Sequence, residues 1–296
     1  MMYPWEELPE QVRDAVTSAC GPIRQAVSLP GGLTSGAAVR LATLSGLMFL
    51  KALPDDSPSA PLYQRERRVG AVLPATVPAP QMLRGGHTAG WVWLLFEHIN
   101  ATRPVDLSPG SSDVASLVEL VRVLGETLTP TPGADVPPIS DNVEFLRKRA
   151  DVLLADPPAD LGCLDAYRSA RAGLDLDAMA GDALLHADLH EGNLMTTEHG
   201  MRVIDWGLAC QGAAWIETAL LISRLILAGH SPQQAETVAS QVPAYKSAPE
   251  EAVTGLMAVW SLFREFVARR GPVPIRASRA RAAAGGRAWV EYRTGQ

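Results

Sequence analysis

The sequence predicts an α+β fold in two parts: a small strand-rich N-terminal lobe over residues 1–99 and a larger helical C-terminal lobe over residues 100–296. Short apolar runs separated by glycine and proline dominate the first part, which is typical of strands and tight turns. After residue 100 the apolar residues recur at spacings of three and four, which is typical of helices. A chain of 296 residues is long enough to bury a sizeable core in each lobe.

The first lobe should begin with a helix over residues 6–19. Five segments have the apolar character of strands: residues 25–29, 37–41, 47–52, 81–83 and 91–96. A second helix is expected over residues 62–73, because Glu66, Val69 and Leu73 fall on one helical stripe. The glycine-rich segment 85–90 is expected to be the turn that joins the last two strands.

In the second lobe, Asp113 is the expected N-cap of a helix that runs to Leu128. Ser231 and Pro232 have the N-cap and first-turn character that opens another helix. The other segments with helical periodicity are residues 142–154, 163–172, 213–228, 250–269 and 277–290.

Composition excludes several classes of function. The net charge of -6 disfavours nucleic-acid binding. Three widely spaced cysteines predict neither a zinc site nor a disulfide framework, and without a signal-peptide pattern a cytoplasmic location is expected. The apolar run 219–222 is soon broken by Ser223 and Arg224, so no membrane span is expected. The sequence contains no signal for an oligomeric state.

The residues best suited to chemistry lie in His-Ala-Asp-Leu-His-Glu-Gly-Asn at 186–193 and Val-Ile-Asp-Trp-Gly at 203–207. The amide oxygen of Asn193 and the carboxylate of Asp205 are hard ligands that suit Mg²⁺. Asp188 is then free to accept the proton of an attacking hydroxyl. This division of labour is the one used in kinase-type phosphoryl transfer.

A second group of residues is suited to holding phosphate. The loop at residues 30–36 has glycines that allow close backbone approach and hydroxyls that can donate, and its candidates are Gly32, Thr34, Ser35 and Gly36. Lys51 ends an apolar strand, and Glu66 on the next helix could pair with it near the α- and β-phosphates. The alternatives are a plain turn, a lysine that extends to solvent and a solvated glutamate among arginines.

The segment 93–99 is expected to be a strand that leads into the hinge between the lobes, where backbone groups of Glu97 and Ile99 could bond a nucleotide base. Phe96 is the candidate back wall of the base pocket, and Ile204 or Leu194 is the candidate floor. The alternative is that these apolar residues are ordinary core.

Residues 186–193 and 204–207 closely resemble the aminoglycoside phosphotransferase (phosphotransferase enzyme) family of small-molecule kinases, and the resemblance extends over roughly residues 25 to 230. It implies a bilobal protein-kinase-like fold, ATP or GTP as phosphoryl donor and bound Mg²⁺. It also implies that Asp188 is the catalytic base or orients the acceptor hydroxyl, and that Asn193 and Asp205 are the metal ligands. Lys51 and Glu66 lie where the family has its lysine–glutamate pair.

The sequence departs from the family pattern at two places. Ala187 replaces the glycine common between the motif histidine and aspartate. Between Glu265 and Gln296 there are seven arginines against two glutamates, whereas aminoglycoside-binding members generally have acidic residues there. A solvated basic helix and a neutral or anionic acceptor are the two interpretations. Glu191 and Glu217 are acidic candidates near the acceptor entrance.

The sequence therefore predicts a kinase that phosphorylates a hydroxyl of a small metabolite or antibiotic. A non-catalytic nucleotide-binding pseudokinase is the first alternative, although the base, the lysine and the metal aspartate are all present. A metal-dependent hydrolase that uses His186 and His190 is the second. A protein kinase is disfavoured, because a helix is expected from residue 213, which leaves no long segment to hold a protein substrate.

Overall fold

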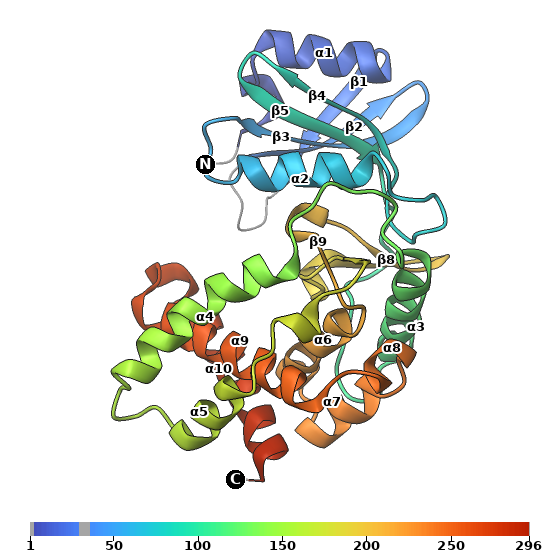
Figure 1. The fold of residues 1–296 in the computed structure, drawn as a ribbon. Coiled ribbons are helices and arrows are strands. Elements are labelled where there is room, and N and C mark those ends of the chain that lie inside the picture. Colours follow the sequence, from blue (N-terminus) through green and yellow to red (C-terminus); the bar gives the residue numbers. More distant parts are fainter. Residues whose placement is uncertain (1–2, 30–35, 296) are drawn as a thin grey trace. The chain divides into compact units, whose positions relative to one another are not determined.

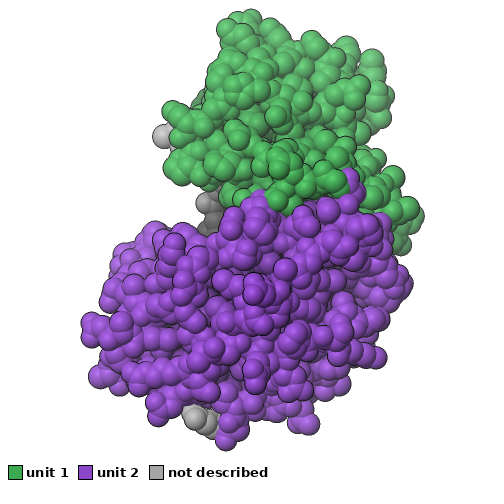
Figure 2. Space-filling model, viewed as in Figure 1, with its two compact units in different colours: residues 1–103, 133–136, 195–209 green, residues 104–132, 137–194, 210–296 purple. Residues whose placement is uncertain are grey.

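A computed structural model describes residues 3–29 and 36–295, and the chain divides into two compact units (Figure 2). Unit 1 comprises residues 1–103, 133–136 and 195–209, and unit 2 comprises residues 104–132, 137–194 and 210–296. The expected lobes differ from these units, because segment 195–209 is built into unit 1. Backbone pairing gives a reason, since the N–H of Val203 donates to the carbonyl of Pro78 at 2.9 Å.

Unit 1 is built on a five-stranded antiparallel sheet with the strand order β1-β2-β3-β5-β4 (Figure 1). Its first elements are η1 (Trp5–Glu7), α1 (Glu10–Cys20), β1 (Ile23–Ser28), β2 (Ala37–Thr43), β3 (Gly46–Pro54), α2 (Ala60–Gly70), β4 (Met82–Thr88) and β5 (Trp91–Glu97). Segment 195–209 adds most of β7 (Leu194–Thr197), all of β8 (Gly200–Val203) and η4 (Trp206–Leu208).

The two faces of this sheet bury different helices. Val12 and Val16 of α1 pack with Leu50 on one face, and Tyr63 of α2 packs with Leu53 on the other. Side chains alternate along a strand, so Lys51 lies on the face opposite Leu50, which is the α2 face. The apolar pattern of β3 thus decides where the lysine emerges.

The expected turn over residues 85–90 is wrong, because β4 continues to Thr88 and only the segment around Ala89 and Gly90 reverses the chain. Gly86 pairs with Trp93 across the sheet, and a Cβ on Gly86 would lie 2.5 Å from the indole ring. The glycine therefore makes room within a strand for a large neighbour instead of marking a turn.

Unit 2 is largely helical (Figure 1). Its longer helices are α3 (Ser112–Thr127), α4 (Ile139–Ala155), α5 (Leu164–Ala172), α6 (Trp215–Leu227), α7 (Pro232–Ala239), α9 (Glu250–Arg270) and α10 (Val273–Thr294). The short elements are η2 (Asp177–Met179), β6 (Ala183–Leu185), η3 (Glu191–Asn193), β9 (Cys210–Gly212) and α8 (Pro243–Lys246). The predicted α+β class is confirmed.

The ends of two helices test the capping predictions. Ser231 caps α7 as expected, with the reciprocal bonds of a capping box to Gln234. The expectation for α3 is wrong, because the N-cap is Ser111, whose hydroxyl accepts from the N–H of Asp113. The Asp113 carboxylate instead accepts from the N–H of Asp106 at 2.9 Å and is buried, so it fixes the approach to the helix.

Helices α9 and α10 pack along one another and form the core of unit 2. Close approach needs a glycine, since a Cβ on Gly286 would lie 2.7 Å from the Cβ of Ser261. The Ser261 hydroxyl donates to the carbonyl of Ala283 at 2.9 Å and lies 2.7 Å from the Tyr167 hydroxyl of α5. Across the described part of the chain, no helix has the length and apolar character needed to cross a membrane.

Candidate active site

In unit 1, Lys51 lies between two carboxylates. Its Nζ donates to Glu66 Oε2 at 2.5 Å and to Asp205 Oδ1 at 3.1 Å. Glu66 comes from the buried stripe of α2, and only 3% of it is exposed, which excludes the solvated-face alternative. Asp205 stands directly before η4, with left-handed backbone at φ 69°, and its side chain is 48% exposed. The structure therefore brings three predicted residues together from β3, α2 and the segment after β8.

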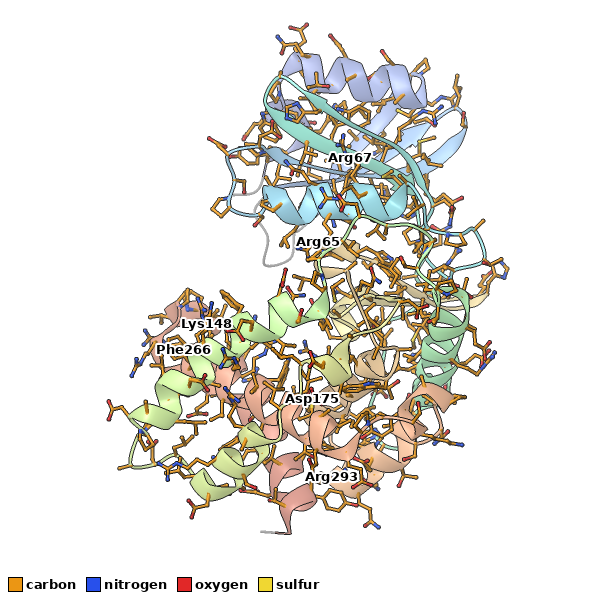
Figure 3. All side chains as sticks on the ribbon, in the orientation of Figure 1. Arg65, Arg67, Lys148, Asp175, Phe266 and Arg293 are labelled. Atoms are coloured by element: carbon orange, nitrogen blue, oxygen red, sulfur yellow. The ribbon has the colours of Figure 1, made fainter. Side chains whose placement is uncertain are left out.

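The charge of Lys51 is held by this arrangement. Burial opposes ionisation of Lys51, but the carboxylates of Glu66 and Asp205 outweigh it and raise the pKa of the ammonium above its ordinary value. The neighbours of Glu66 on α2, Arg65 and Arg67, are labelled in Figure 3 and have other partners. Arg65 donates to the carbonyl of Ala209 at 3.2 Å, and the stem of Arg67 lies beside Gly85.

The predicted phosphate loop lies largely outside the described residues, which leave out Gly32, Thr34 and Ser35. Gly36 is described and needs to be glycine, because its φ is 151° and a Cβ would lie 2.9 Å from the carbonyl oxygen of Ala52. Whether these residues hold phosphate stays a prediction.

The four residues predicted to surround the base also lie in unit 1. Phe96 is buried in the cluster that includes Tyr63, so it is a core residue in addition to any role beside a base. The Glu97 carboxylate accepts from the N–H of Gln81 at 3.1 Å. Ile99 and Ile204 are both half-buried. Their contact with a nucleotide stays a prediction.

In unit 2, the predicted catalytic loop follows β6, and its backbone donates hydrogen bonds to the buried carboxylate of Glu217. The backbone N–H of His186 donates to Glu217 Oε2 at 2.6 Å, and that of Ala187 donates to both carboxylate oxygens at 3.2 Å. Burial raises the pKa of Glu217 to about 7, and the nearby charge of Asp188 adds to the rise. The hydrogen bonds from the two N–H groups lower the pKa, but by less. Glu217 is only 5% exposed, so the expectation that it lies at an acceptor entrance is wrong.

The backbone at Ala187 explains why family members commonly have glycine there. Its φ is 62°, a left-handed conformation that costs a residue with a Cβ about 1–2 kcal/mol. This bend lets the consecutive N–H groups of His186 and Ala187 meet one carboxylate. The backbone at position 187 therefore has the conformation that glycine adopts easily, and the alanine present there is strained.

Asp188 is held in the ionised state. Its Oδ1 accepts from Arg224 Nη2 at 3.2 Å, and its Oδ2 lies 3.6 Å from His190 Nε2. Burial opposes ionisation, but the contact with the His190 imidazole and the positive charge of Arg224 outweigh it and lower the pKa of Asp188. An ionised carboxylate at neutral pH can accept a proton or align a hydroxyl.

Asn193 is oriented by its own loop. Its Nδ2 donates to the backbone carbonyl of Asp188 at 3.0 Å, which leaves the amide oxygen as its remaining acceptor. The Asn193 amide oxygen in unit 2 and the partly exposed Asp205 carboxylate in unit 1 are each a hard oxygen ligand of the kind that Mg²⁺ prefers. Their binding of one metal ion stays a prediction. Within residues 3–29 and 36–295, no group of three His, Cys, Asp or Glu side chains could hold a metal, which disfavours a cluster on His186 and His190.

The roles of two residues that contact this loop were not predicted from the sequence. Glu217 holds the loop, and Arg224 pairs with Asp188. Both lie on α6, one on the first turn and the other near the end. A charged residue inside a strongly apolar helix was the available signal, because such a residue is buried only when it has partners.

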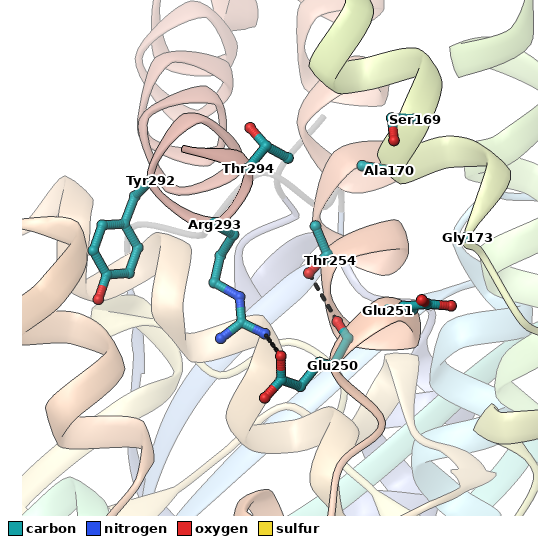
Figure 4. Close-up of a pocket in the computed structure, with 9 residues that line it drawn as sticks. All are labelled: Ser169, Ala170, Gly173, Glu250, Glu251, Thr254, Tyr292, Arg293 and Thr294. Carbon is teal, nitrogen blue, oxygen red and sulfur yellow. Dashed lines mark hydrogen bonds and ion pairs between the residues drawn. The ribbon is translucent and has the colours of Figure 1, made fainter. Parts of the chain in front are cut away.

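A groove of about 700 Å³ lies elsewhere on unit 2, beside the ends of α5 and α10 and the first turns of α9 (Figure 4). Arg293 Nη2 pairs there with Glu250 Oε2 at 3.4 Å, and the carbonyl of Glu250 accepts from the Thr254 hydroxyl at 2.8 Å. Among the described residues that line this groove, none belongs to the predicted site. The groove is therefore not assigned to the chemistry above.

A strand-rich unit with a lysine–glutamate pair and a helical unit with the Asp188 loop define a phosphotransferase of protein-kinase-like fold. Residues 27–253 match the profile of the phosphotransferase enzyme family, and the chain belongs to this family. It is a phosphotransferase with an alcohol group as acceptor. A search of curated sequences gave no match.

Solved structures share the fold at low sequence identity. A Ralstonia eutropha protein crystallised as a candidate aminoglycoside phosphotransferase is 16% identical with a TM-score of 0.64, over 96% of this chain and 97% of that one. The choline kinase LicA of Streptococcus pneumoniae is 16% identical with a TM-score of 0.61, over 93% and 96%. A spectinomycin phosphotransferase crystallised with ADP and spectinomycin is 12% identical with a TM-score of 0.56, over 91% and 89%. The predicted kinase-like fold is confirmed.

Proposed function

We propose that this phosphotransferase moves the γ-phosphoryl group of ATP or GTP to a hydroxyl of a small metabolite or antibiotic. The observation that carries the proposal is the Lys51 ammonium, held between Glu66 at 2.5 Å and Asp205 at 3.1 Å. An ammonium fixed in this way suits the oxygens of a nucleotide phosphate. The ADP in the crystals of the related spectinomycin phosphotransferase supports a nucleotide donor.

Each predicted residue has a role in this proposal. Lys51 binds phosphate oxygens and Glu66 positions it, while Asn193 and Asp205 hold Mg²⁺. When bound, Mg²⁺ supplies charge neutralisation at the phosphate oxygens. The residues proposed to contact the nucleotide elsewhere are Gly32, Thr34, Ser35, Gly36, Phe96, Glu97, Ile99 and Ile204.

Asp188 is proposed to act on the acceptor. The acceptor oxygen forms a bond to the γ-phosphorus while the bond from that phosphorus to the β–γ bridging oxygen breaks, and ADP or GDP leaves. The acceptor proton passes to Asp188 and then to solvent. The low pKa of Asp188 suits a group that aligns the hydroxyl and takes its proton late in the transfer.

A small acceptor is supported by the short connection after Asp205. The chain passes through η4 and β9 and enters α6 at Trp215. A protein substrate would want a longer segment on which to dock. We therefore propose a metabolite or antibiotic as the acceptor.

The test is a coupled assay of ADP or GDP release with a panel of hydroxylated metabolites and antibiotics. Asp188→Asn should lower acceptor-dependent release by roughly 10²- to 10⁴-fold while the nucleotide still raises the melting temperature. Asp165→Asn is the matched control, because this aspartate on α5 is exposed and its partner among the described residues, Arg168, is distant at 3.7 Å. Near-normal turnover of Asp188→Asn would contradict the role of this residue. Nucleotide binding without acceptor-dependent release across the panel would favour the pseudokinase.

A further inference from the structure

Beside Asp188, unit 2 gathers arginines from three helices. Arg224 of α6 donates to Asp188 Oδ1 at 3.2 Å. The guanidinium carbons of Arg224 and of Arg264 on α9 lie 5.5 Å and 4.6 Å from the ring centroid of Trp260, so the two charges share one indole. Arg279 of α10 adds a third positive charge, which lowers the pKa of both Arg224 and Arg264.

This arginine cluster, defined as Arg224, Arg264 and Arg279, is short of negative charge. Over the described residues, neither Arg264 nor Arg279 makes a hydrogen bond or ion pair, and Arg264 Nε is buried without an acceptor. The carboxylates that act on Arg224 are Asp188 in contact and the exposed Glu191 at longer range. Burial, with the charges of Arg224 and Arg279, lowers the pKa of Arg264 to about 9. The three side chains are partly buried, and guanidinium groups that lack acceptors in such a place suit an anionic ligand.

An aromatic surface continues from the cluster. Arg264 also lies 5.7 Å from the ring centroid of Phe263, whose ring is 5.9 Å from that of Phe145 on α4. Arg149 covers Phe145 at 3.5 Å, yet half of Phe145 is exposed. The surroundings are the packed helices α4 and α9, which Figure 3 marks by Lys148 and Phe266. An apolar ring or chain could lie on this surface next to the charges.

We propose that the acceptor is a hydroxylated organic anion, whose carboxylate or phosphate pairs with Arg264 and Arg279 while its hydroxyl meets Asp188. This inference rests on the proposed phosphoryl transfer and names the class of molecule that receives the group. The carbon skeleton of the acceptor lies on the rings of Phe263 and Phe145. The transfer step itself is unchanged.

The arginine cluster disfavours a cationic acceptor. The carboxylate that could attract it, Asp188, is already paired with Arg224. The two other guanidinium groups would repel it, because like charges brought together in a binding site disfavour the wrong partner. The acceptor of this chain therefore differs in charge from choline, the substrate named for the related LicA enzyme.

Binding is tested first, without nucleotide, by thermal shift and calorimetry. The probes share one skeleton and differ in charge: mandelate, 1-phenyl-1,2-ethanediol and 2-amino-1-phenylethanol. Glycerate and glycerol 3-phosphate compare a carboxylate with a phosphate, and a library of hydroxylated metabolites and antibiotics, with choline and hygromycin B, is sorted by net charge. The expected binders are anions. A library whose binders are neutral or cationic, or that yields no anionic binder, overturns the inference.

The second arm uses variants of two arginines on α9. Arg264→Gln should raise the dissociation constant and the KM of the anionic acceptor by roughly 10- to 100-fold, with a smaller change in kcat. Arg270→Gln is the matched control, since this exposed arginine rests on Phe266 and should keep wild-type values. Equal loss of nucleotide and acceptor binding in Arg264→Gln would assign the cluster to the donor and overturn the inference.

The two proposals fail in different ways. Anion binding that depends on Arg264, with no ADP or GDP release, overturns the proposed transfer and supports the anion site. Release that depends on Asp188, with a neutral or cationic acceptor and no effect of Arg264→Gln, supports the transfer and overturns the anion site.

Discussion

The charge clusters of the two units have net charges of opposite sign. In unit 1, one ammonium lies between two carboxylates, those of Glu66 and Asp205. In unit 2, one carboxylate, Asp188, is in contact with the guanidinium of Arg224, and the charge of Arg279 acts on both Arg224 and Arg264. The first cluster has a surplus of negative charge and suits a metal cation, whereas the second has a surplus of positive charge and suits an anion. The sign of the surplus thus indicates which ligand each cluster would hold.

The buried glutamates of the two units differ in the same way. Glu66 is paired with an ammonium at 2.5 Å. Glu217 has no cation in contact within the described chain and accepts instead from the N–H groups of His186 and Ala187. A carboxylate held only by neutral donors keeps its proton more readily. The predictions below begin with the largest expected effect, that of Lys51→Met with Arg264→Met as its matched comparison. Glu217→Gln tests the second glutamate, and Ala187→Gly tests backbone strain beside it.

Lys51→Met should have the largest effect on stability. It leaves Glu66, which is almost fully buried, without its cation, and breaking a buried pair in this way typically costs about 3–5 kcal/mol of unfolding free energy. Urea unfolding of the ligand-free protein measures the loss. Adding Glu66→Gln to the same chain should recover much of it.

The matched change in unit 2 is Arg264→Met. It removes a charge that has positive neighbours and no carboxylate in contact, so the unfolding free energy should stay near the wild-type value or rise. Equal losses for Lys51→Met and Arg264→Met would break the comparison between the clusters.

Glu217→Gln should change how stability depends on pH. The folded chain keeps the Glu217 proton up to a pKa of about 7, whereas the unfolded chain loses it near 4.5. Unfolding free energy should therefore fall as pH rises from about 4.5 to 7, by roughly 3 kcal/mol from this group, and level off above. The variant should lack that fall in urea titrations at a series of pH values. A pH dependence identical to wild type would show that Glu217 is an ordinary carboxylate.

Ala187→Gly should have a small effect, a gain in stability of up to about 1 kcal/mol. Glycine removes the left-handed strain at φ 62°, and its greater freedom in the unfolded chain offsets part of the gain. Ala180→Gly is the control, because Ala180 has φ -65° and should lose stability. The two melting temperatures should move in opposite directions, and a loss in both would argue against strain at Ala187.

Local patterns were enough to predict the longer helices and most strands of unit 1. Short apolar runs indicated the strands around Lys51, and the Ser231 cap indicated the start of α7, because both depend on neighbouring residues alone. The sequence failed where a distant residue decides the outcome. Gly86 lies in a strand instead of a turn because it faces Trp93, and no local pattern shows that contact.

By itself the sequence determined the class of chemistry, since Lys51, Asp188 and Asp205 are the residue types that phosphoryl transfer needs and stand in the family's order. The tertiary structure decided which charges surround them. Arg224 and Arg264 are distant from Asp188 along the chain, and only the packing of α6, α9 and α10 brings the three helices together. Electrostatic interactions depend on distance through space and on burial, and neither quantity is written in the order of the residues.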